Sequence, residues 1–457
     1  MEQKQNRMGT AKELPLLLSM GVPMMISMLI QSLYNIVDSM FVAKLGTDAF
    51  TAVSLAFPLQ NIVISVAVGV GVGISTAISI SLGAGDQQKA NRAATVGVTL
   101  TVLHCILFVI MGLLVTRPFL QMFTSDLEIL EQACNYTYIV LCFSSGSLLQ
   151  ICLEKIFQAV GSMKITMVLL MLGCILNIIL DPILIFGLFG MPAMGVSGAA
   201  AATVIGQSVP VFFYFALIIR RNIGVRLDRR YILPDKETVK RIYSVGVPST
   251  LMLAIPSVLV SFLNGILAQI SQVYVAVLGI YFKLQTFIYM PASGLVQGLR
   301  PIVGYNYGAG EYQRVRRTVS YALLLALAMM AIGTVAAFCF PAQILSLFDE
   351  DGQMIRYGVP ALRLISLGFL VSAVGVVYSG TFEGLGMGKQ SLIISLLRQF
   401  VIILPLGWVL SIPFGAAGIW ISFPVAELVA AVVSVILLRR THNGQLSPGF
   451  RLGNRGI

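Results

Sequence analysis

We predict an all-α, polytopic membrane protein of twelve transmembrane helices, arranged as two parallel lobes of six helices each. Three observations lead to this fold class. Of the 457 residues, 57% are hydrophobic and only 11% are charged, whereas a soluble domain carries about 25% charged residues. Apolar stretches long enough to cross about 30 Å of hydrocarbon recur along the chain. The second half of the sequence also repeats motifs of the first half in a constant register.

The apolar stretches predict helices, because a backbone without access to water must pair its polar groups within the segment. A transmembrane β-barrel would instead show segments of about ten residues with alternating hydrophobicity, and the sequence lacks this pattern. The first apolar run is much longer than the core of a signal peptide, so we interpret it as a retained span. The twelve predicted spans are 14–42, 50–82, 93–116, 133–159, 165–188, 197–219, 242–269, 274–306, 318–340, 358–382, 390–412 and 418–438.

The distribution of Lys and Arg predicts the orientation of these spans. The two termini and every second connection hold most of these residues, whereas the opposite connections hold only Lys44, Arg117 and Arg356. By the positive-inside rule, both termini should lie in the cytoplasm, with the protein in a bacterial inner membrane. The net charge of +11 follows from this topology, and we expect no nucleic acid as a partner.

The internal repeat predicts how the spans are grouped. The motif GVP at Gly21–Pro23 returns at Gly246–Pro248, and GAG at Gly83–Gly85 returns at Gly308–Gly310, with the same spacing in both cases. Six spans return the chain to its starting side, so the two halves share one orientation about an axis along the membrane normal. We predict an N-terminal lobe at 1–219, a basic cytoplasmic linker at 220–241, a C-terminal lobe at 242–438 and a cytoplasmic tail at 439–457.

Polar residues inside the spans are the candidates for function, because a charge at the bilayer centre costs about 2.5–3.5 kcal/mol on insertion scales. The first span carries a polar stripe on one helical face, formed by Gln31, Tyr34, Asn35 and Asp38. Pro23, earlier in the same span, should kink this helix.

The fifth span adds Asn177 and Asp181, which lie one turn apart and are followed by Pro182. A proline at this position frees the carbonyl of Ile178, because it removes one helical hydrogen bond, and we expect a helix kink there as well. Both Asp38 and Asp181 lie one to two turns from the outer end of their spans, so they should meet at similar depth.

These residues predict a cation or proton site. Two carboxylates, an amide oxygen and a hydroxyl such as that of Thr203 could coordinate a transient Na⁺. Alternatively, burial and mutual repulsion would hold one exchangeable proton on the two carboxyl groups. A third interpretation is that Asp38 and Asp181 merely cap their spans near the outer headgroups.

The C-terminal half differs, because the positions equivalent to Asp38 and Asp181 in the repeat are Leu263 and Leu406. We therefore expect the coupling chemistry in the N-terminal lobe alone. The C-terminal spans hold four cations and one acid that could serve as their counter-ion: Lys283, Arg300, Arg363, Arg398 and Glu427. They either line a cavity or serve as snorkelling or structurally paired charges.

The sequence offers little for catalysis. The six cysteines form no C-x-x-C motif, only two histidines exist, and no H-E-x-x-H motif is present. We expect no enzyme activity, no cofactor and no structural metal.

Several segments together resemble one family. They are the GVP motif, QSLYNIVDSMF at Gln31–Phe41, SLGAG at Ser81–Gly85, NIILDP at Asn177–Pro182, GAAAAT at Gly198–Thr203 and RPIVGYNYGAG at Arg300–Gly310. Over nearly its whole length the chain resembles the multidrug and toxic compound extrusion (MATE) family, and is most similar to its DinF-like and MepA-like bacterial branch.

The resemblance implies two six-helix lobes, a V-shaped cavity, and export of amphipathic, often cationic compounds driven by H⁺ or Na⁺. It also implies that Asp38, Asn177, Asp181 and Thr203 form the cation site and that the first helix bends at Pro23. NorM-like members place acids in the seventh and tenth spans. Here only Glu383 is present, at the inner end of the tenth span, so we expect no second Na⁺ site.

From the residues and the resemblance, we expect a monomeric H⁺- or Na⁺-coupled antiporter. It would export small amphipathic drugs or metabolites across the lipid bilayer by alternating access. The alternative is a flippase of the same superfamily that moves lipid-linked oligosaccharide or peptidoglycan precursors, because four intramembrane cations suit a pyrophosphate headgroup.

Overall fold

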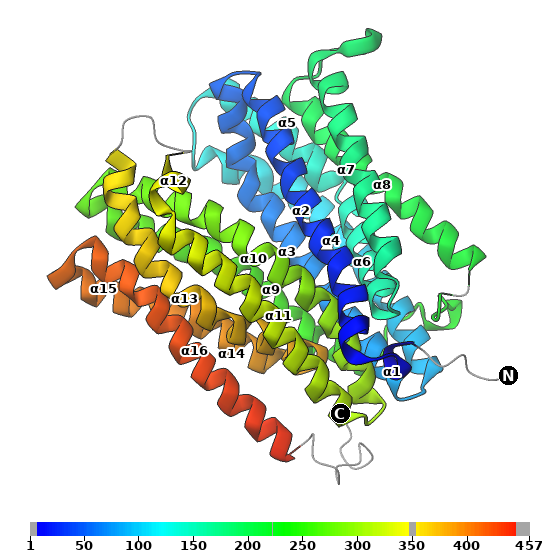
Figure 1. The fold of residues 1–457 in the computed structure, drawn as a ribbon. Coiled ribbons are helices and arrows are strands. Elements are labelled where there is room, and N and C mark those ends of the chain that lie inside the picture. Colours follow the sequence, from blue (N-terminus) through cyan, green and yellow to red (C-terminus); the bar gives the residue numbers. More distant parts are fainter. Residues whose placement is uncertain (1–6, 222, 347–352, 445–457) are drawn as a thin grey trace. The chain divides into compact units, whose positions relative to one another are not determined.

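The computed structural model describes residues 7–221, 223–346 and 353–444, and every regular element in these residues is a helix (Figure 1). The part of the predicted tail beyond residue 444 lies outside the described residues. Eleven described helices are long and apolar enough to cross a membrane, and a bent pair of helices brings the number to twelve. The predicted all-α fold with twelve spans is therefore confirmed.

The elements follow one another along the chain without a strand in the described residues. They are α1 (Arg7–Thr10), α2 (Glu13–Ala43), α3 (Thr47–Gly83), α4 (Gln87–Gln121), α5 (Leu127–Cys142), α6 (Ser145–Ala159), α7 (Met163–Phe186), η1 (Leu188–Gly190), α8 (Val196–Arg220), η2 (Arg229–Tyr231), α9 (Lys236–Ile270), α10 (Gln272–Gly308), α11 (Tyr312–Cys339), α12 (Pro341–Leu345), α13 (Gln353–Gly384), α14 (Gly388–Leu396), η3 (Leu397–Val401), α15 (Ile403–Phe414) and α16 (Ala416–Gly444).

Two spans are less regular than their sequences suggest. The predicted span 133–159 consists of α5 and α6, which meet at an angle of 43°. The predicted span 390–412 consists of α14 and α15 joined by the π-helical turn η3. Apolar composition measures the length of a span but not its straightness, so neither break is visible in the sequence.

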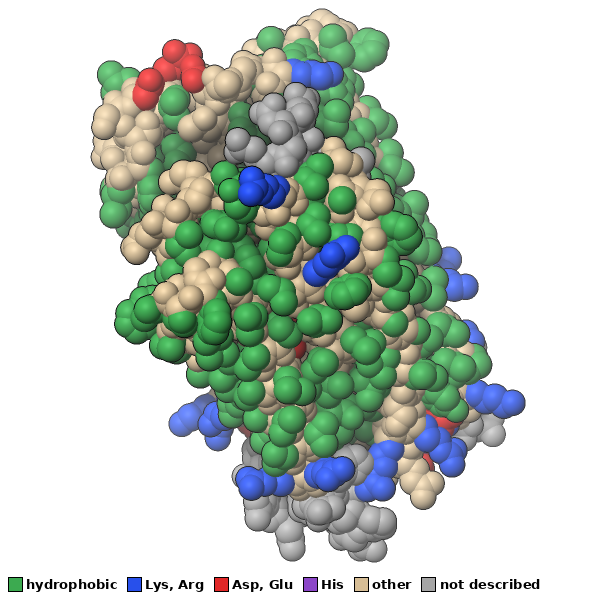
Figure 2. Space-filling view, turned by 60° about the vertical axis from the view of Figure 1, so that its left-hand side comes forward, with side chains coloured by type: hydrophobic (Ala, Val, Ile, Leu, Met, Phe, Trp, Pro, Cys, Tyr) green, Lys and Arg blue, Asp and Glu red, His purple; other side chains and the backbone are tan. Residues whose placement is uncertain are grey.

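Most helices extend beyond the predicted spans, because polar residues continue the helix past the hydrocarbon. Helix α4 begins at Gln87, where the Asp86 side chain accepts from the N–H of Lys89 at 2.9 Å. This hydrogen bond holds the pKa of the Asp86 carboxyl below its usual value. On the face shown in Figure 2, hydrophobic side chains cover the middle, and most Lys and Arg side chains gather at the lower end. Such a pattern suits a bilayer, whereas the side on which the termini lie stays a prediction.

The chain divides into two compact units, which we call the N-terminal unit (Ile26–Thr250) and the C-terminal unit (Met1–Met25 with Leu251–Ile457). In the N-terminal unit, α3 packs against α4, α5 and α6, and α7 packs against α8. In the C-terminal unit, α13 packs against α10, α11 and α16. The two boundaries between the units fall inside α2 and α9, at positions that are equivalent in the internal repeat.

The two halves of α2 belong to different units, and so do the two halves of α9. The first half of α2 lies in the C-terminal unit, and the first half of α9 lies in the N-terminal unit. The predicted lobes, 1–219 and 242–438, place the divisions between helices instead. The repeat in the sequence predicts only whole spans in each lobe, because it does not show against which helices the two halves of a long helix pack.

Glycines on the neighbouring helices explain these packing positions. In the C-terminal unit, a methyl group added at Gly298 of α10 would lie 2.6 Å from the backbone nitrogen of Gly21 in α2. In the N-terminal unit, a methyl group at Gly73 of α3 would collide with the backbone carbonyl of Ile242 in α9. Gly73 and Gly298 are equivalent in the repeat. Small residues let helix backbones approach closely, which is a main source of helix association in lipid.

We predict that Gly73→Ala destabilises the protein by about 1–3 kcal/mol, because the added methyl group overpacks a backbone contact. The matched control is Gly279→Ala, at a helical glycine with nothing within 4 Å of the added methyl. There, alanine should be neutral or stabilising by up to about 1 kcal/mol. Thermal unfolding in detergent, followed by circular dichroism, measures both changes. Equal unfolding temperatures for the two variants would contradict the close approach of α3 and α9.

Candidate functional site

The candidate site lies in the N-terminal unit, where α7 and α8 approach each other through two glycines. A methyl group added at Gly173 of α7 would lie 2.7 Å from the carbonyl oxygen of Gly206 in α8. This close approach brings Asn177, one turn further along α7, to Thr203 of α8. Both side chains are buried, with 2% and 3% of their surface exposed.

The amide of Asn177 connects Thr203 to the acid on the same helix. Its hydrogen bonds are satisfied when its nitrogen donates to Asp181 Oδ2 at 2.9 Å and its oxygen accepts from the backbone N–H of Thr203 at 3.1 Å. The Thr203 hydroxyl lies 3.3 Å from the same end of the amide. The amide therefore fixes the position of one carboxylate oxygen of Asp181, which has 0% exposure.

Asp38 of α2 completes an acid pair with Asp181. The two carboxyl groups lie within hydrogen-bonding reach of each other. A carboxylate only accepts hydrogen bonds, so a bond between two such groups requires one proton on the pair. Within the described part of the chain, the buried Oδ1 atoms of Asp38 and Asp181 have no hydrogen-bond partner. The pair therefore offers two acceptor atoms to a cation.

Two tyrosines and a glutamine surround the acids. Tyr34 of α2 lies close to Asp38 and to the side chain of Thr203. Tyr136 of α5 lies close to both acids, and its hydroxyl donates to Gln60 Oε1 of α3 at 3.5 Å. Neither Tyr136 nor Gln60 was predicted from the sequence to belong to the site. The one available signal was that Gln60 is a polar residue inside an apolar span.

The structure divides the predicted polar stripe. Tyr34 and Asp38 take part in the site, whereas Gln31 and Asn35 have exposed side chains. Helices α2 and α7 continue through Pro23 and Pro182, and kinks at these two positions stay a prediction.

In the C-terminal unit, the predicted charges mostly have partners. Arg398 lies in η3 and forms a bidentate pair with Glu427 of α16, with Nε–Oε2 and Nη2–Oε1 distances of 2.7 and 3.0 Å. Both residues are buried. The guanidinium carbon also lies 6.0 Å from the centre of the Tyr289 ring, and Gly375 leaves room for the arginine, since a methyl group there would lie 2.7 Å from Arg398 Cδ. This arrangement is a closed ion pair.

The other three predicted cations have different surroundings. Arg300 pairs with the buried Glu383 at 2.6 Å, and the Nε of Arg363 donates to the carbonyl of Phe338 at 3.2 Å. Lys283 has an exposed side chain. Two of the four arginine and lysine side chains are thus neutralised by an acid in the same unit.

The comparison with known families matches the internal repeat. A model of the MatE family matches residues 23–183 and 248–409, which together make up more than half of the chain. The chain belongs to the MatE family. The two matched segments begin at Pro23 and Pro248, the equivalent prolines of the repeated GVP motif. The resemblance seen in the sequence is confirmed.

Known MatE relatives are similar over almost the full length. A multidrug export protein MepA from Staphylococcus saprophyticus is 26% identical over 419 residues, or 92% of each chain. An outward-facing multidrug resistance MATE family transporter of the MOP superfamily superposes with a TM-score of 0.91, at 26% identity, over 97% of this chain and 99% of its own.

A second solved structure carries a different description. It is a MOP superfamily transporter from Pyrococcus furiosus, whose binding pocket of reverse polarity is said to suggest a different function. It superposes with a TM-score of 0.90 at 26% identity, over 98% of this chain and all of its own. The same fold thus accommodates pockets of different charge, and the charges of each chain must be examined separately.

We predict that Glu427→Gln in this MatE protein lowers the free energy of unfolding by about 3–5 kcal/mol, because Arg398 then keeps a buried charge without its counter-ion. The double variant Arg398→Met with Glu427→Leu should recover most of this loss, since it buries no charge. The matched control is Glu131→Gln, which breaks the exposed pair with Arg117 and should cost about 0–1 kcal/mol. Unfolding in detergent measures all three variants. A double variant as unstable as Glu427→Gln would contradict a closed ion pair.

Proposed function

We propose that this MatE protein exports amphipathic, cationic drugs or metabolites in exchange for H⁺ or Na⁺, by alternating access and as a monomer. The single observation that supports the exchange is the pair formed by the half-buried Asp38 and the buried Asp181, with a buried oxygen of each carboxyl left without a hydrogen-bond partner in the described residues. Multidrug export by the MepA relatives supports the class of substrate.

The physical basis of coupling is competition for one negative site. Two carboxylates cannot both remain charged at close range in a low-dielectric site, so the pair holds a proton or a metal cation when no other cation is near. A cationic substrate that approaches the acids displaces the bound ion, and a returning ion displaces the substrate. Export then follows when the site opens to the two sides of the membrane in turn.

The geometry favours H⁺ over Na⁺ as the coupling ion. A hydrogen bond between the neighbouring carboxyl groups of Asp38 and Asp181 would need a proton on one of them, and the Asn177 amide already donates to Oδ2 of Asp181. One proton moving down about 150 mV supplies roughly 3.5 kcal/mol. This free energy supports a substrate gradient of a few hundred-fold, because about 1.4 kcal/mol corresponds to a factor of ten.

The paired cations of the C-terminal unit speak against the flippase alternative. A pyrophosphate headgroup requires positive charges that no acid already compensates, but two of the four predicted cations, Arg300 and Arg398, each pair with a glutamate. The proposed location is a bacterial inner membrane with cytoplasmic termini, which the distribution of Lys and Arg supports.

We predict that Asp38→Asn and Asp181→Asn uncouple dye efflux from the ion gradient in proteoliposomes. A pH gradient should accelerate efflux by the unmodified protein, and this acceleration should fall roughly 5- to 150-fold in either variant. The matched control is Asp48→Asn, an exposed acid near the start of α3, which should retain full coupling. The same assay under a Na⁺ gradient identifies Na⁺ as the coupling ion if only that gradient drives efflux. Unchanged coupling in Asp38→Asn would exclude the acid pair from the mechanism.

We also predict that the acid pair holds a proton at neutral pH. Infrared difference spectra should show the carbonyl band of a buried protonated carboxyl group in the unmodified protein and in Asp48→Asn. The band should be lost in Asp181→Asn, because the remaining acid then has no carboxylate partner with which to share the proton. Its absence from the unmodified protein would contradict a proton-sharing pair.

A further inference from the structure

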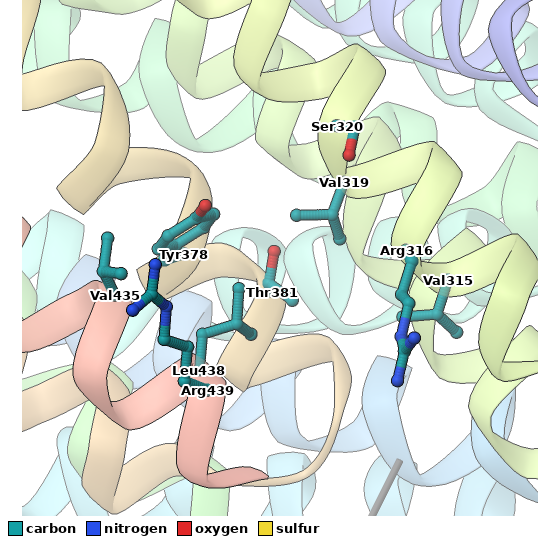
Figure 3. A pocket seen from close by; sticks show the side chains of 9 residues that line it. All are labelled: Val315, Arg316, Val319, Ser320, Tyr378, Thr381, Val435, Leu438 and Arg439. Atoms are coloured by element: carbon teal, nitrogen blue, oxygen red, sulfur yellow. The ribbon is translucent and has the colours of Figure 1, made fainter. Parts of the chain in front are cut away.

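A cavity of about 370 Å³ lies in the C-terminal unit between α11, α13 and α16 (Figure 3). Its lining comes from the first turns of α11 and from the last turns of α13 and α16. The cavity is therefore at the end of the unit where the loop between α10 and α11 lies. By the distribution of Lys and Arg this is the cytoplasmic end, at the depth of lipid headgroups.

The lining is cationic on opposite sides of the cavity. Arg316 and Ser320 extend from α11, and Tyr378 and Arg439 lie across from them on α13 and α16 (Figure 3). None of the nine lining residues is acidic. Two guanidinium groups with no acid among the lining side chains give the cavity a positive potential, which attracts an anion.

The hydroxyl groups of the lining add hydrogen-bond donors. Tyr378 lies within the electrostatic reach of Arg439. Ser320 and Tyr378 each contribute a hydroxyl group to the lining. The hydroxyl of Thr381 already donates to the carbonyl of Val377 at 2.8 Å, so it contributes no donor. Two guanidinium groups and two hydroxyls match the several acceptor oxygens of a phosphate group.

The remaining lining is apolar. Three valines and a leucine complete the wall, and these side chains suit the hydrocarbon part of an amphipathic anion rather than a free inorganic ion. A volume of about 370 Å³ lies within the range of small-molecule sites. Basic pockets between transmembrane helices on the cytoplasmic side are a known setting for binding lipid phosphates.

We propose that the cavity between α11, α13 and α16 binds a phosphate ester, and that its position and apolar lining favour an anionic phospholipid of the inner leaflet as the source. The bound phosphate bridges Arg316 at the beginning of α11 to Arg439 near the end of α16. The lipid thereby ties together helices that are distant in the sequence. This site is separate from the acid pair, and its occupancy does not depend on the coupling ion.

Native mass spectrometry and thermal unfolding of the detergent-solubilised full chain test the proposal. The probes are short-chain phosphatidylglycerol, inorganic phosphate, and a diacylglycerol with the same chains but no phosphate. Phosphatidylglycerol should remain bound and raise the unfolding temperature with concentration, as expected for a ligand of the folded state. Equal binding of the diacylglycerol would overturn the proposal. Binding of inorganic phosphate as strong as that of the lipid would support the phosphate site and identify the free ion as its source.

A matched pair of variants separates the cavity from general surface charge. The double variant Arg316→Gln with Arg439→Gln should weaken lipid binding by about tenfold or more, because both charged donors are lost. The control, Arg317→Gln with Arg440→Gln, removes the same charge from adjacent residues that do not line the cavity. Equal loss of binding in the two double variants would show that only surface charge attracts the lipid, and would overturn the site.

A third variant tests the cavity without changing its charge. Ser320 has an exposed side chain, so Ser320→Trp can fill the opening and leave both arginines in place. We expect this variant to unfold at an unchanged temperature without lipid and to lose the stabilisation by phosphatidylglycerol. Full lipid stabilisation in Ser320→Trp would place the lipid elsewhere and contradict the proposal.

Discussion

The absence of water from the hydrocarbon is the constraint on which the rest of the structure depends. It forces the backbone into helices and requires a partner for each polar side chain within a span. Most buried charges meet this requirement: Arg398 has Glu427, and Arg300 has Glu383. Asp38 and Asp181 meet it only in part, because Asn177 donates to one oxygen of Asp181 and the buried Oδ1 atom of each acid has no hydrogen-bond partner among the described residues. The incomplete pairing sets the proposed exchange site apart from the charges that hold helices together.

The internal repeat allows the buried charges of the two units to be compared position by position. Both halves of the sequence repeat the same six-span pattern, yet the positions equivalent to Asp38 and Asp181 are Leu263 and Leu406. The C-terminal unit has arginine–glutamate pairs in which each charge is neutralised by a fixed partner. A fixed pair has no need of a mobile ion, so the exchange that we propose belongs to the N-terminal unit. The two units share a fold but differ in what their buried polar groups require.

The sequence predicted the features that depend on local pattern. Span lengths follow from apolar runs, and the proximity of Asn177 to Asp181 follows from helical spacing. The meeting of Asp38 with Asp181 followed from their similar depth. Tyr136 and Gln60 were missed, because their place in the site depends on how α3 and α5 pack. The break between α5 and α6 and the π-helical turn at Arg398 were missed for a related reason, since apolar composition does not distinguish a straight helix from a bent one.

The crossing of α2 and α9 between units has a consequence for biosynthesis. The C-terminal unit contains Met1–Met25, and the N-terminal unit contains residues up to Thr250. The ribosome must therefore pass Thr250 before the N-terminal unit has all its residues, although six spans are complete well before that point. The first half of α2, among the earliest segments made, has to wait for α10 before it can dock. Insertion into the membrane and final assembly are thus separated in time. If the chain were cut between the sixth and seventh spans, the first fragment would lack the first half of α9, and the second fragment would lack the first half of α2.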